Sequence, residues 1–292
     1  MDSLLRHIRA CNNAALPGGR VRFAVAGEPV GWLDPALAER LLGLGCTRTA
    51  RGVNARPEQL QPLARALADA GLVPWRSEPF DVRPELDDTE RGNIALGQLD
   101  RGACPAFGVQ EAGVHLNGLV EQGGATKLWV ARRSASKLLD PGKLDHLVAG
   151  GIPSGLGPAE TLRKEADEEA GIPPALVAGA VHVATIGYAM QRPEGLRRDW
   201  LYCYDLHLPP DFRPEARDGE VAGFELWDLP RVLETVRRSD DFKFNVNLVL
   251  IDLFLRRGLV GGEEAVQLRA ALARQPSGGA AAIGMSRDSP PG

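Results

Sequence analysis

The chain has 292 residues, of which 44% are hydrophobic and 25% are charged, and its formal net charge is −4. This composition is typical of a globular protein, and the length allows one large domain or two ordinary ones. The chain lacks the basic excess of nucleic-acid-binding proteins, so we expect no nucleic-acid partner.

The four cysteines are scattered without a CxxC pair, which argues against a zinc site or a disulfide framework. No apolar run reaches the ~18 residues that a membrane span needs, and the N-terminal stretch has no uninterrupted apolar core of a signal peptide. We therefore expect a soluble, cytoplasmic protein with no membrane partner.

Residues 1–104 are predicted to form a small α+β domain. Apolar and other residues alternate over 21–25, as in a half-buried strand. The stretches 35–42 and 57–70 each begin with proline and carry apolar residues at helical spacing, which predicts two helices. Prolines, aspartates and glycines dominate 76–102, which we interpret as a connector. We identify no catalytic constellation in this part of the chain.

Residues 105–260 are predicted to form a second domain, of α/β type. Four stretches have the composition of strands, namely 114–120, 127–132, 177–186 and 199–208. The first two are joined by Glu-Gln-Gly-Gly, which predicts a hairpin. Helical spacing predicts helices over 230–238 and from residue 246 to the glycine at 258. Residues 261–292 form a C-terminal tail that we expect to be disordered at its end.

The stretch 150–172 concentrates the potential chemistry of the chain. Gly157 and Pro158 predict the beginning of a helix, because proline is tolerated in the first turn. Gly171 followed by Pro173 predicts its end. Small and apolar residues recur on one face of this helix, which would allow close packing against a sheet.

The other face of the predicted helix carries Glu165, Glu168 and Glu169. Residues three and four apart are neighbours on a helix, so the three carboxylates form one acidic patch. Like charges at this spacing cost roughly 0.2–0.5 kcal/mol, and carboxylates in the last turn also meet the negative end of the helix dipole. The patch is either a solvated charged face or, as these costs favour, a site for a hard cation such as Mg²⁺ or Mn²⁺.

This stretch resembles the Nudix box, GX5EX7REUXEEXGU with U aliphatic. Its spacing is complete from the glycine at 150 to Gly171 and the isoleucine at 172, with Glu165 and the pair Glu168 and Glu169 at the positions of the motif's last three glutamates. Two positions depart from the pattern. Leu156 stands at the position of the first glutamate, and Lys164 replaces the arginine.

The resemblance implies a Nudix α/β/α sandwich with a mixed sheet, preceded here by the small α+β domain. It also implies that Glu165, Glu168 and Glu169 bind Mg²⁺ or Mn²⁺ and act in hydrolysis of a small-molecule diphosphate substrate. Glu220 resembles the distal acidic residue that many Nudix enzymes use as a further ligand or general base, and its alternative role is that of an ordinary carboxylate at the start of a strand.

Further candidates for substrate binding lie near the motif. Arg132 and Arg133 are phosphate contacts or ordinary surface residues. The backbone at Gly150 and Gly151 allows close approach, because no Cβ is present. Trp200 and Tyr202 share one face of a predicted strand, where aromatic residues pack in a core or stack on a flat heterocycle.

The sequences flanking the box narrow the resemblance. They are similar to the Nudix region associated with thiamine pyrophosphokinase in fungi and to its stand-alone plant relatives, over roughly residues 100–260. This likeness implies hydrolysis of thiamine diphosphate analogues, notably oxidised or damaged forms, to the monophosphate and phosphate. Hydrolysis of a nucleoside diphosphate derivative such as a nucleotide sugar, or diphosphate sensing without catalysis, are the alternatives. The number of metal ions, the oligomeric state and the role of the first hundred residues stay open.

Overall fold

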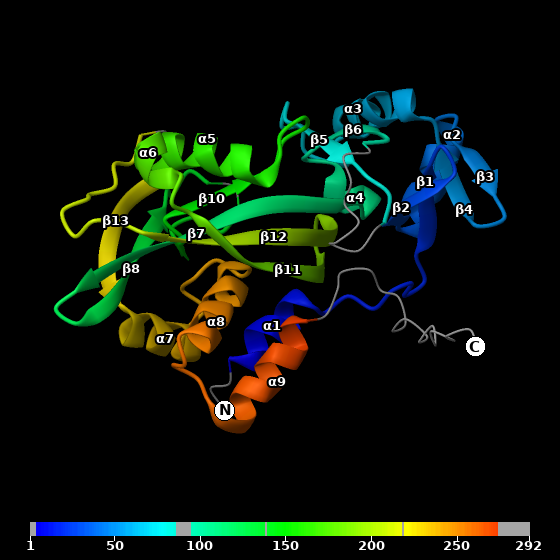
Figure 1. The fold of residues 1–292 in the computed structure, drawn as a ribbon. Helices are drawn as coiled ribbons and strands as arrows, with labels where there is room; N and C mark the ends of the chain where they lie inside the picture. Colours follow the sequence, from blue (N-terminus) through cyan, green and yellow to red (C-terminus); the bar gives the residue numbers. More distant parts are fainter. Residues whose placement is uncertain (1–3, 86–94, 138, 218, 274–292) are drawn as a thin grey trace, which may run out of the picture.

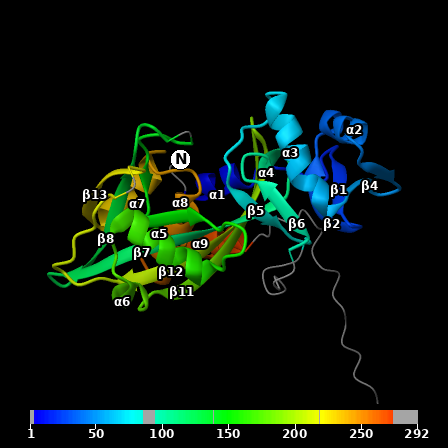
Figure 2. The same cartoon turned by 90° about the horizontal axis from the view of Figure 1, so that it is seen from above.

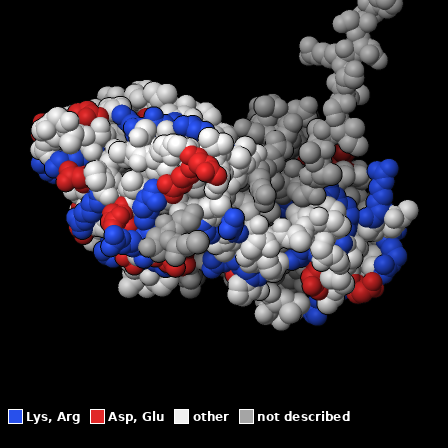
Figure 3. All heavy atoms as spheres, turned by 90° about the horizontal axis from the view of Figure 1, so that it is seen from below, with Lys and Arg blue, Asp and Glu red and all other residues white. Residues whose placement is uncertain are grey.

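The computed structural model describes residues 4–85, 95–137, 139–217 and 219–273. The described chain forms two lobes that lie side by side (Figure 1). Within these ranges, no helix combines the length and the apolar character needed to cross a membrane. The face of the molecule seen in Figure 3 carries acidic and basic side chains interspersed, as the small net charge leads one to expect.

The smaller lobe is built on a four-stranded sheet of order β2-β1-β4-β3. Its strands are β1 (Val21–Val25), β2 (Glu28–Leu33), β3 (Thr47–Thr49) and β4 (Gly52–Ala55). Its helices are α2 (Pro35–Gly43), the short 3-10 helix η1 (Pro57–Gln59), α3 (Leu60–Asp69) and α4 (Cys104–Phe107). Within this four-stranded sheet, as far as its residues are described, β1 and β4 pair in parallel and the other neighbours pair antiparallel. The expected α+β architecture is therefore present. Both predicted helices are found: α2 begins at Pro35, and η1 begins at Pro57 and leads directly into α3.

The stretch interpreted as a connector contains regular structure. Strands β5 (Pro79–Val82) and β6 (Gly97–Asp100) pair antiparallel as a separate two-stranded sheet. Residues 86–94, within the same stretch, lie outside the described residues. The interpretation was wrong for the two strands because each has only four residues, too few for alternation to stand out among prolines and aspartates. Figure 2 shows this β5–β6 hairpin at the junction of the two lobes.

The larger lobe contains a seven-stranded mixed sheet whose main order is β11-β12-β7-β8-β13. Its strands are β7 (Gln110–Gln122), β8 (Ala125–Arg133), β9 (Leu144–Asp145), β10 (Val148–Gly151), β11 (Val181–Arg192), β12 (Gly195–His207) and β13 (Val221–Asp228). The predicted hairpin is confirmed: β7 and β8 pair antiparallel, and Gly123 and Gly124 make the turn with positive φ angles. Strands β12 and β7 pair in parallel, which makes the sheet mixed.

Helices cover both faces of this sheet (Figure 1). Helices α5 (Pro158–Ala170) and α6 (Pro174–Val177) bury apolar residues on one face, and α8 (Val246–Arg256) packs on the other with α7 (Leu229–Arg238), α9 (Gly262–Leu272) and α1 (Leu5–Cys11). Alternate residues of each central strand enter the two separate apolar cores, as strand geometry requires. The predicted α/β/α sandwich with a mixed sheet, preceded by a small α+β unit, is thus confirmed.

Both ends of the described chain contribute to the core around α8. Leu4 and Ile8, in and beside α1, are fully buried against it, and Leu268 of α9 is 1% exposed. Helix α9 lies in the stretch 261–292 expected to be a tail, and residues 274–292 are outside the described part. The domain boundaries at 104 and 260 stay predictions, and α1 packs with the larger lobe.

Candidate metal and diphosphate site

Local sequence sets the limits of helix α5. Gly157 has an extended backbone and Pro158 follows it, and the Glu160 carboxylate accepts a hydrogen bond from the Gly157 N–H at 2.9 Å. Gly171 closes the helix in the left-handed conformation, with φ of 61°, and donates to the carbonyl of Asp167 at 3.1 Å. The helix therefore occupies the segment that its glycines and prolines predict.

Small buried residues on α5 bring the helix close to strand β10. Ala166 and Ala170 are fully buried and Leu162 is nearly so, all in the core beneath α5. The helix runs directly over β10 in Figure 1. This close packing sets the acidic side of α5 against the backbone of β10, where the carboxylates meet backbone groups.

Glu169 is the most deeply buried of the three glutamates, with 6% of its surface exposed. Its Oε2 atom accepts a hydrogen bond from the Ala149 N–H of β10 at 2.8 Å. Burial raises the pKa of this carboxyl well above its usual range, whereas the bond from Ala149 lowers it. The negative charge of Asp145, and after it that of Glu165, raises the pKa further.

Glu165 lies over the backbone of β10 and has 17% of its side chain exposed. A Cβ atom on Gly150 would lie 2.5 Å from its Cγ atom, so the glycine is what makes room for this side chain. Burial raises the pKa of Glu165, Lys164 lowers it, and the negative charges of Glu168 and Glu220 raise it.

Lys164 links two of the carboxylates. Its Nζ atom lies 3.1 Å from Oε1 of Glu165 and 2.5 Å from Oε2 of Glu168. Hydrogen bonding to Glu168, and then to Glu165, raises the pKa of the lysine. Lys164, which replaces the arginine of the motif, therefore still contacts two of the glutamates and makes one hydrogen bond to each.

Glu220 precedes strand β13 and forms an ion pair with Lys137. Its backbone carbonyl accepts from the Ser134 N–H at 2.8 Å, which ties this end of β13 to the end of β8. Because its charge acts on Glu165, the structure brings it into the electrostatic neighbourhood of α5, although it lies outside the motif.

The donor set of α5 fits Mg²⁺ or Mn²⁺. Carboxylate oxygens are the hard ligands these ions prefer, and Glu165 and Glu169 are two mutually repelling carboxylates in a largely buried position. A divalent cation would relieve both the repulsion and the cost of burial. Glu168, whose side chain is 50% exposed, is held at the helix surface by Lys164.

A second group of possible ligands lies on β7, on β9 and just after β9, and the charge of its Asp145 acts on Glu169. Among the described residues, the atoms of His115, Asp145 and His146 come within 4.8 Å of one another, which the α5 glutamates do not. The two imidazole Nδ1 atoms are 3.0 Å apart, and Arg133 donates to Asp145 at 2.6 Å. Burial, above all, lowers the pKa values of both histidines, and the positive charge of half-buried Lys243 lowers them further.

With Arg133 and Lys243 already beside Asp145, this group is a poor site for a further cation. It is a buried polar network of the core instead. Sequence reasoning missed it, because the two histidines are 31 residues apart and meet only through the pairing of β7 with the β9–β10 segment.

The two predicted phosphate-binding arginines differ in their surroundings. Arg132 is exposed and donates to the carbonyl of Gly142 at 3.0 Å. Arg133 is 9% exposed and donates to Asp145 and to the carbonyls of Leu139 and Asp140. Arg133 is therefore a structural residue that holds the segment after β8, and Arg132 stays the candidate for phosphate contact.

Side chains of the protein occupy the space that a Cβ atom would take at Gly150 and Gly151. Glu165 occupies the space beside Gly150, and Phe80 of β5 and Arg101 occupy the space beside Gly151. The backbone of this segment stays a predicted contact for substrate, but the glycines serve first to admit these side chains.

The two predicted aromatic residues lie on β12. Trp200 is only 3% exposed, and its partners across the sheet are Gly187 and Ala112. Tyr202 is half-buried, and its ring centroid is 6.0 Å from that of exposed His182. Of the two, Tyr202 has the accessible ring for stacking on a ligand, and that role stays a prediction.

Comparison with known proteins identifies the family. A NUDIX domain is matched over residues 114–246, which include all four candidate glutamates. A Yersinia pestis protein described as an uncharacterized Nudix hydrolase is 44% identical over 181 residues, which are 61% of this chain and 90% of that protein. The chain belongs to the Nudix family.

The chain is also similar to a plant protein and to a solved structure. Nudix hydrolase 20, a chloroplastic protein of Arabidopsis thaliana, is 39% identical over 211 residues, or 72% of this chain and 55% of the plant protein. This Nudix chain thus spans just over half the length of that relative. A Deinococcus radiodurans crystal structure aligns with 68% of this chain and 100% of its own, at 24% identity and a TM-score of 0.44.

Proposed function

We propose that this Nudix protein hydrolyses the diphosphate bond of thiamine diphosphate analogues, notably oxidised or damaged forms, in the presence of Mg²⁺. The observation that carries the diphosphate chemistry is the placement of Glu165 and Glu169 against β10, with Glu168 beside them at the surface of α5. Family membership supports the reaction class, and the likeness of the flanking sequences supports the thiamine moiety.

The α5 carboxylates would hold the metal ion beside the substrate. When bound, Mg²⁺ supplies charge neutralisation for the diphosphate oxygens as the bridging P–O bond breaks. The chain's own part is positional: Gly150 admits Glu165, Ala149 fixes Glu169, and Lys164 orients the more exposed Glu168. These contacts support the proposal, because they would hold the carboxylates near their binding positions before substrate arrives and would limit the reorganisation needed.

Water is the second substrate. Its oxygen bonds to one phosphorus, the bridging P–O bond breaks, and the analogue monophosphate and phosphate leave. We assign Glu220 the task of orienting this water and accepting its proton, because its charge acts on Glu165 from outside α5. Exposed Arg132 is the candidate cation for the phosphate, and Tyr202 the candidate surface for an aromatic ring.

The test is a substrate panel. The purified protein with Mg²⁺ is incubated with oxothiamine diphosphate, oxythiamine diphosphate, thiamine diphosphate and nucleotide sugars, and monophosphate formation is followed. We expect the oxidised thiamine compounds to have the highest kcat/KM. A preference for nucleotide sugars would refute the thiamine assignment and keep the reaction class. Diphosphate binding without turnover of any compound would refute the reaction class as well and identify a sensor.

A further inference from the structure

The loop between β10 and α5 is held by the smaller lobe. Residues 152–157 form this loop, and the Ser154 N–H donates to the carbonyl of Pro79 on β5 at 2.8 Å. The Ser154 hydroxyl donates to Oδ1 of Asp81 at 2.5 Å, and the Gly155 N–H approaches Oδ2 of the same carboxylate at 3.4 Å. One carboxylate of β5 therefore fixes two consecutive residues of the loop.

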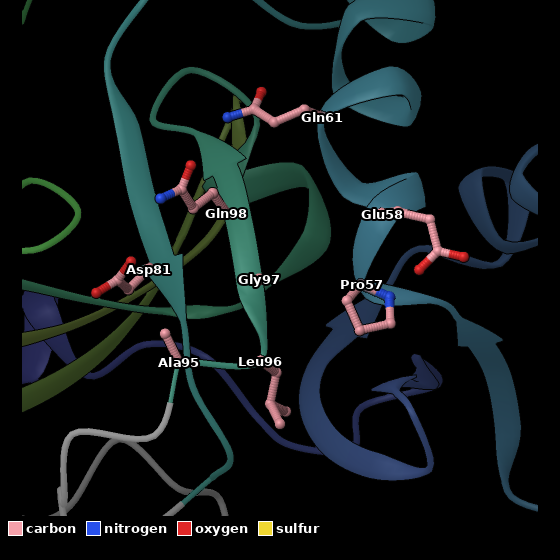
Figure 4. Close-up of a pocket in the computed structure, with 8 residues that line it drawn as sticks. All are labelled: Pro57, Glu58, Gln61, Asp81, Ala95, Leu96, Gly97 and Gln98. Atoms are coloured by element: carbon pink, nitrogen blue, oxygen red, sulfur yellow. The ribbon is translucent and has the colours of Figure 1, made fainter.

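Strand β6 completes the contact. Nε2 of Gln98 donates to the Ser154 hydroxyl oxygen at 2.5 Å, so this hydroxyl accepts from β6 while it donates to β5. Figure 4 shows Asp81 and Gln98 on the adjacent strands of the hairpin, with both side chains directed away from α3. Both residues also line an open cavity of ≈ 490 Å³, so a change at either leaves no sealed void in the core.

Close packing adds to these hydrogen bonds. A Cβ atom on Gly151 would lie 2.6 Å from Cζ of Phe80 and 3.3 Å from Cζ of Arg101. The Arg101 guanidinium lies 5.3 Å from the centre of the Phe80 ring and is paired with Glu78 at 2.9 Å. The last residue of β10 is thus enclosed by side chains from the hairpin.

The hairpin itself is firmly anchored in the smaller lobe. The Asp100 carboxylate is 1% exposed and accepts from the backbone N–H groups of Arg76, Glu78 and Gly102. Gly97 packs against Leu60 of α3. The hairpin that contacts the loop before α5 is therefore itself held by hydrogen bonds and by packing against α3.

We propose that the β5–β6 hairpin is a positioning element for the candidate site, with Asp81 and Gln98 as positioning residues that act through Ser154. They hold residues 151–155 in place. These residues join β10 to the first turn of α5, so their position also sets the position of Glu165 and Glu169 relative to β10. In this loop, Leu156 stands where the Nudix motif has a glutamate, and Asp81 supplies a carboxylate from outside the motif. The smaller lobe would thus position the candidate site, and the expected effect on catalysis rests on the proposed function.

The test uses the full chain with two substitutions, Ser154→Ala and Asp81→Asn. Ser154→Thr keeps the hydroxyl and serves as the conservative rescue. Asp69→Asn is the matched control, because it makes the same chemical change in an exposed ion pair with Arg65 of α3. Hydrogen exchange at residues 150–157 is followed by mass spectrometry, and the half-saturating Mg²⁺ concentration is measured with the best diphosphate of the panel.

We expect Ser154→Ala and Asp81→Asn to speed amide exchange in 150–157, and to raise the half-saturating Mg²⁺ concentration about tenfold, as loss of supports behind metal ligands typically does. Ser154→Thr and Asp69→Asn should keep wild-type values. Unchanged exchange in both variants would overturn the inference. Exchange needs no turnover, so it tests the inference even if the proposed hydrolysis fails. If Asp81→Asn unfolds because its ion pair with Arg83 is broken, the exchange of Ser154→Ala alone supports or overturns the inference.

Discussion

The carboxylate of Glu165 lies directly beside the Cα atom of Gly150. A Cβ atom built on this glycine would be 2.5 Å from Cγ and 2.8 Å from Oε2 of Glu165. Contacts below 3 Å cannot be accommodated without movement, and the group that would move is the carboxylate of Glu165, a candidate metal ligand. The first glycine of the motif is thus explained by the helix that follows it.

Gly150→Ala should therefore displace Glu165 and lower kcat at least about tenfold, the low end of the cost of disturbing a metal site. The fold should persist, because the side chain has solvent on one side to move into. Steady-state kinetics measures kcat, and thermal unfolding measures whether the fold persists. Gly43→Ala is the matched control, since a Cβ there meets nothing within 4 Å. Equal kcat in Gly150→Ala and Gly43→Ala would contradict this account.

Glu169→Gln separates charge from shape at the most buried carboxylate. The amide oxygen can still accept from Ala149, and a buried negative charge disappears. We expect turnover to fall at least about 100-fold while the free energy of unfolding does not decrease. Glu160→Gln, on the same helix, changes only the group that caps Gly157 and should keep activity. Full Mg²⁺-dependent turnover by Glu169→Gln would refute the assignment of the site.

Helix α5 could be predicted from the local spacing of its residues, whereas the contacts around it depend on the tertiary structure. Gly157, Pro158 and Gly171 determine the helix ends by backbone preference alone, and i,i+3 and i,i+4 spacing gathers the glutamates. No local rule pairs Ser154 with Asp81, because their contact depends on how the two lobes meet. Burial of Trp200 likewise depends on what covers its strand, so its face was predictable and its exposure was not.

Lys164 should act through the carboxylates it holds. Lys164→Met removes both hydrogen bonds, and we expect the half-saturating Mg²⁺ concentration to rise roughly tenfold. Lys164→Arg restores the cation with a planar fork that can bond Glu165 and Glu168 together, so its Mg²⁺ requirement should equal the wild-type value or be lower. Mg²⁺ titration of turnover measures this, and a Lys164→Met curve that overlays the wild type would show that the lysine is dispensable.

A buried ion pair joins the two lobes at another point. Arg198 of β12 is completely buried and pairs with Glu85, which also pairs with Arg22 of β1. Glu85→Gln removes the charge that both ion pairs share, including one charged partner of the buried Arg198 guanidinium, which costs about 1.5–3 kcal/mol and should lower Tm by roughly 5 °C. Glu39→Gln breaks only an exposed pair with Arg48 and should shift Tm little. Calorimetry compares the two, and equal shifts would show that Glu85 contributes no more than a surface residue.

The pair His115 and His146 should make stability depend on pH. Burial, above all, lowers the pKa of His146 from 6.5 to about 4, and it lowers the pKa of His115 well below its usual value. Between pH 6.5 and about 4 the unfolded chain binds protons that the folded chain does not. The contribution of the two histidines to the free energy of unfolding therefore falls as the pH falls through this window, by about 1–2 kcal/mol per histidine between pH 7 and pH 5. Buried carboxyls with raised pKa values, such as Glu111 and Glu169, act in the opposite direction.

Urea unfolding at pH 7, 6 and 5 measures this dependence. His146→Gln removes one of the two buried imidazoles, so it should lose about 1–2 kcal/mol less stability than the wild type between pH 7 and pH 5. His207→Gln, at an exposed site, should leave the dependence unchanged. If the wild type and His146→Gln lost equal stability between pH 7 and pH 5, the imidazole of His146 would have to be protonated in the folded protein. The hydrogen bond between the two Nδ1 atoms, which needs one of them as acceptor, would then require that His115 stay neutral.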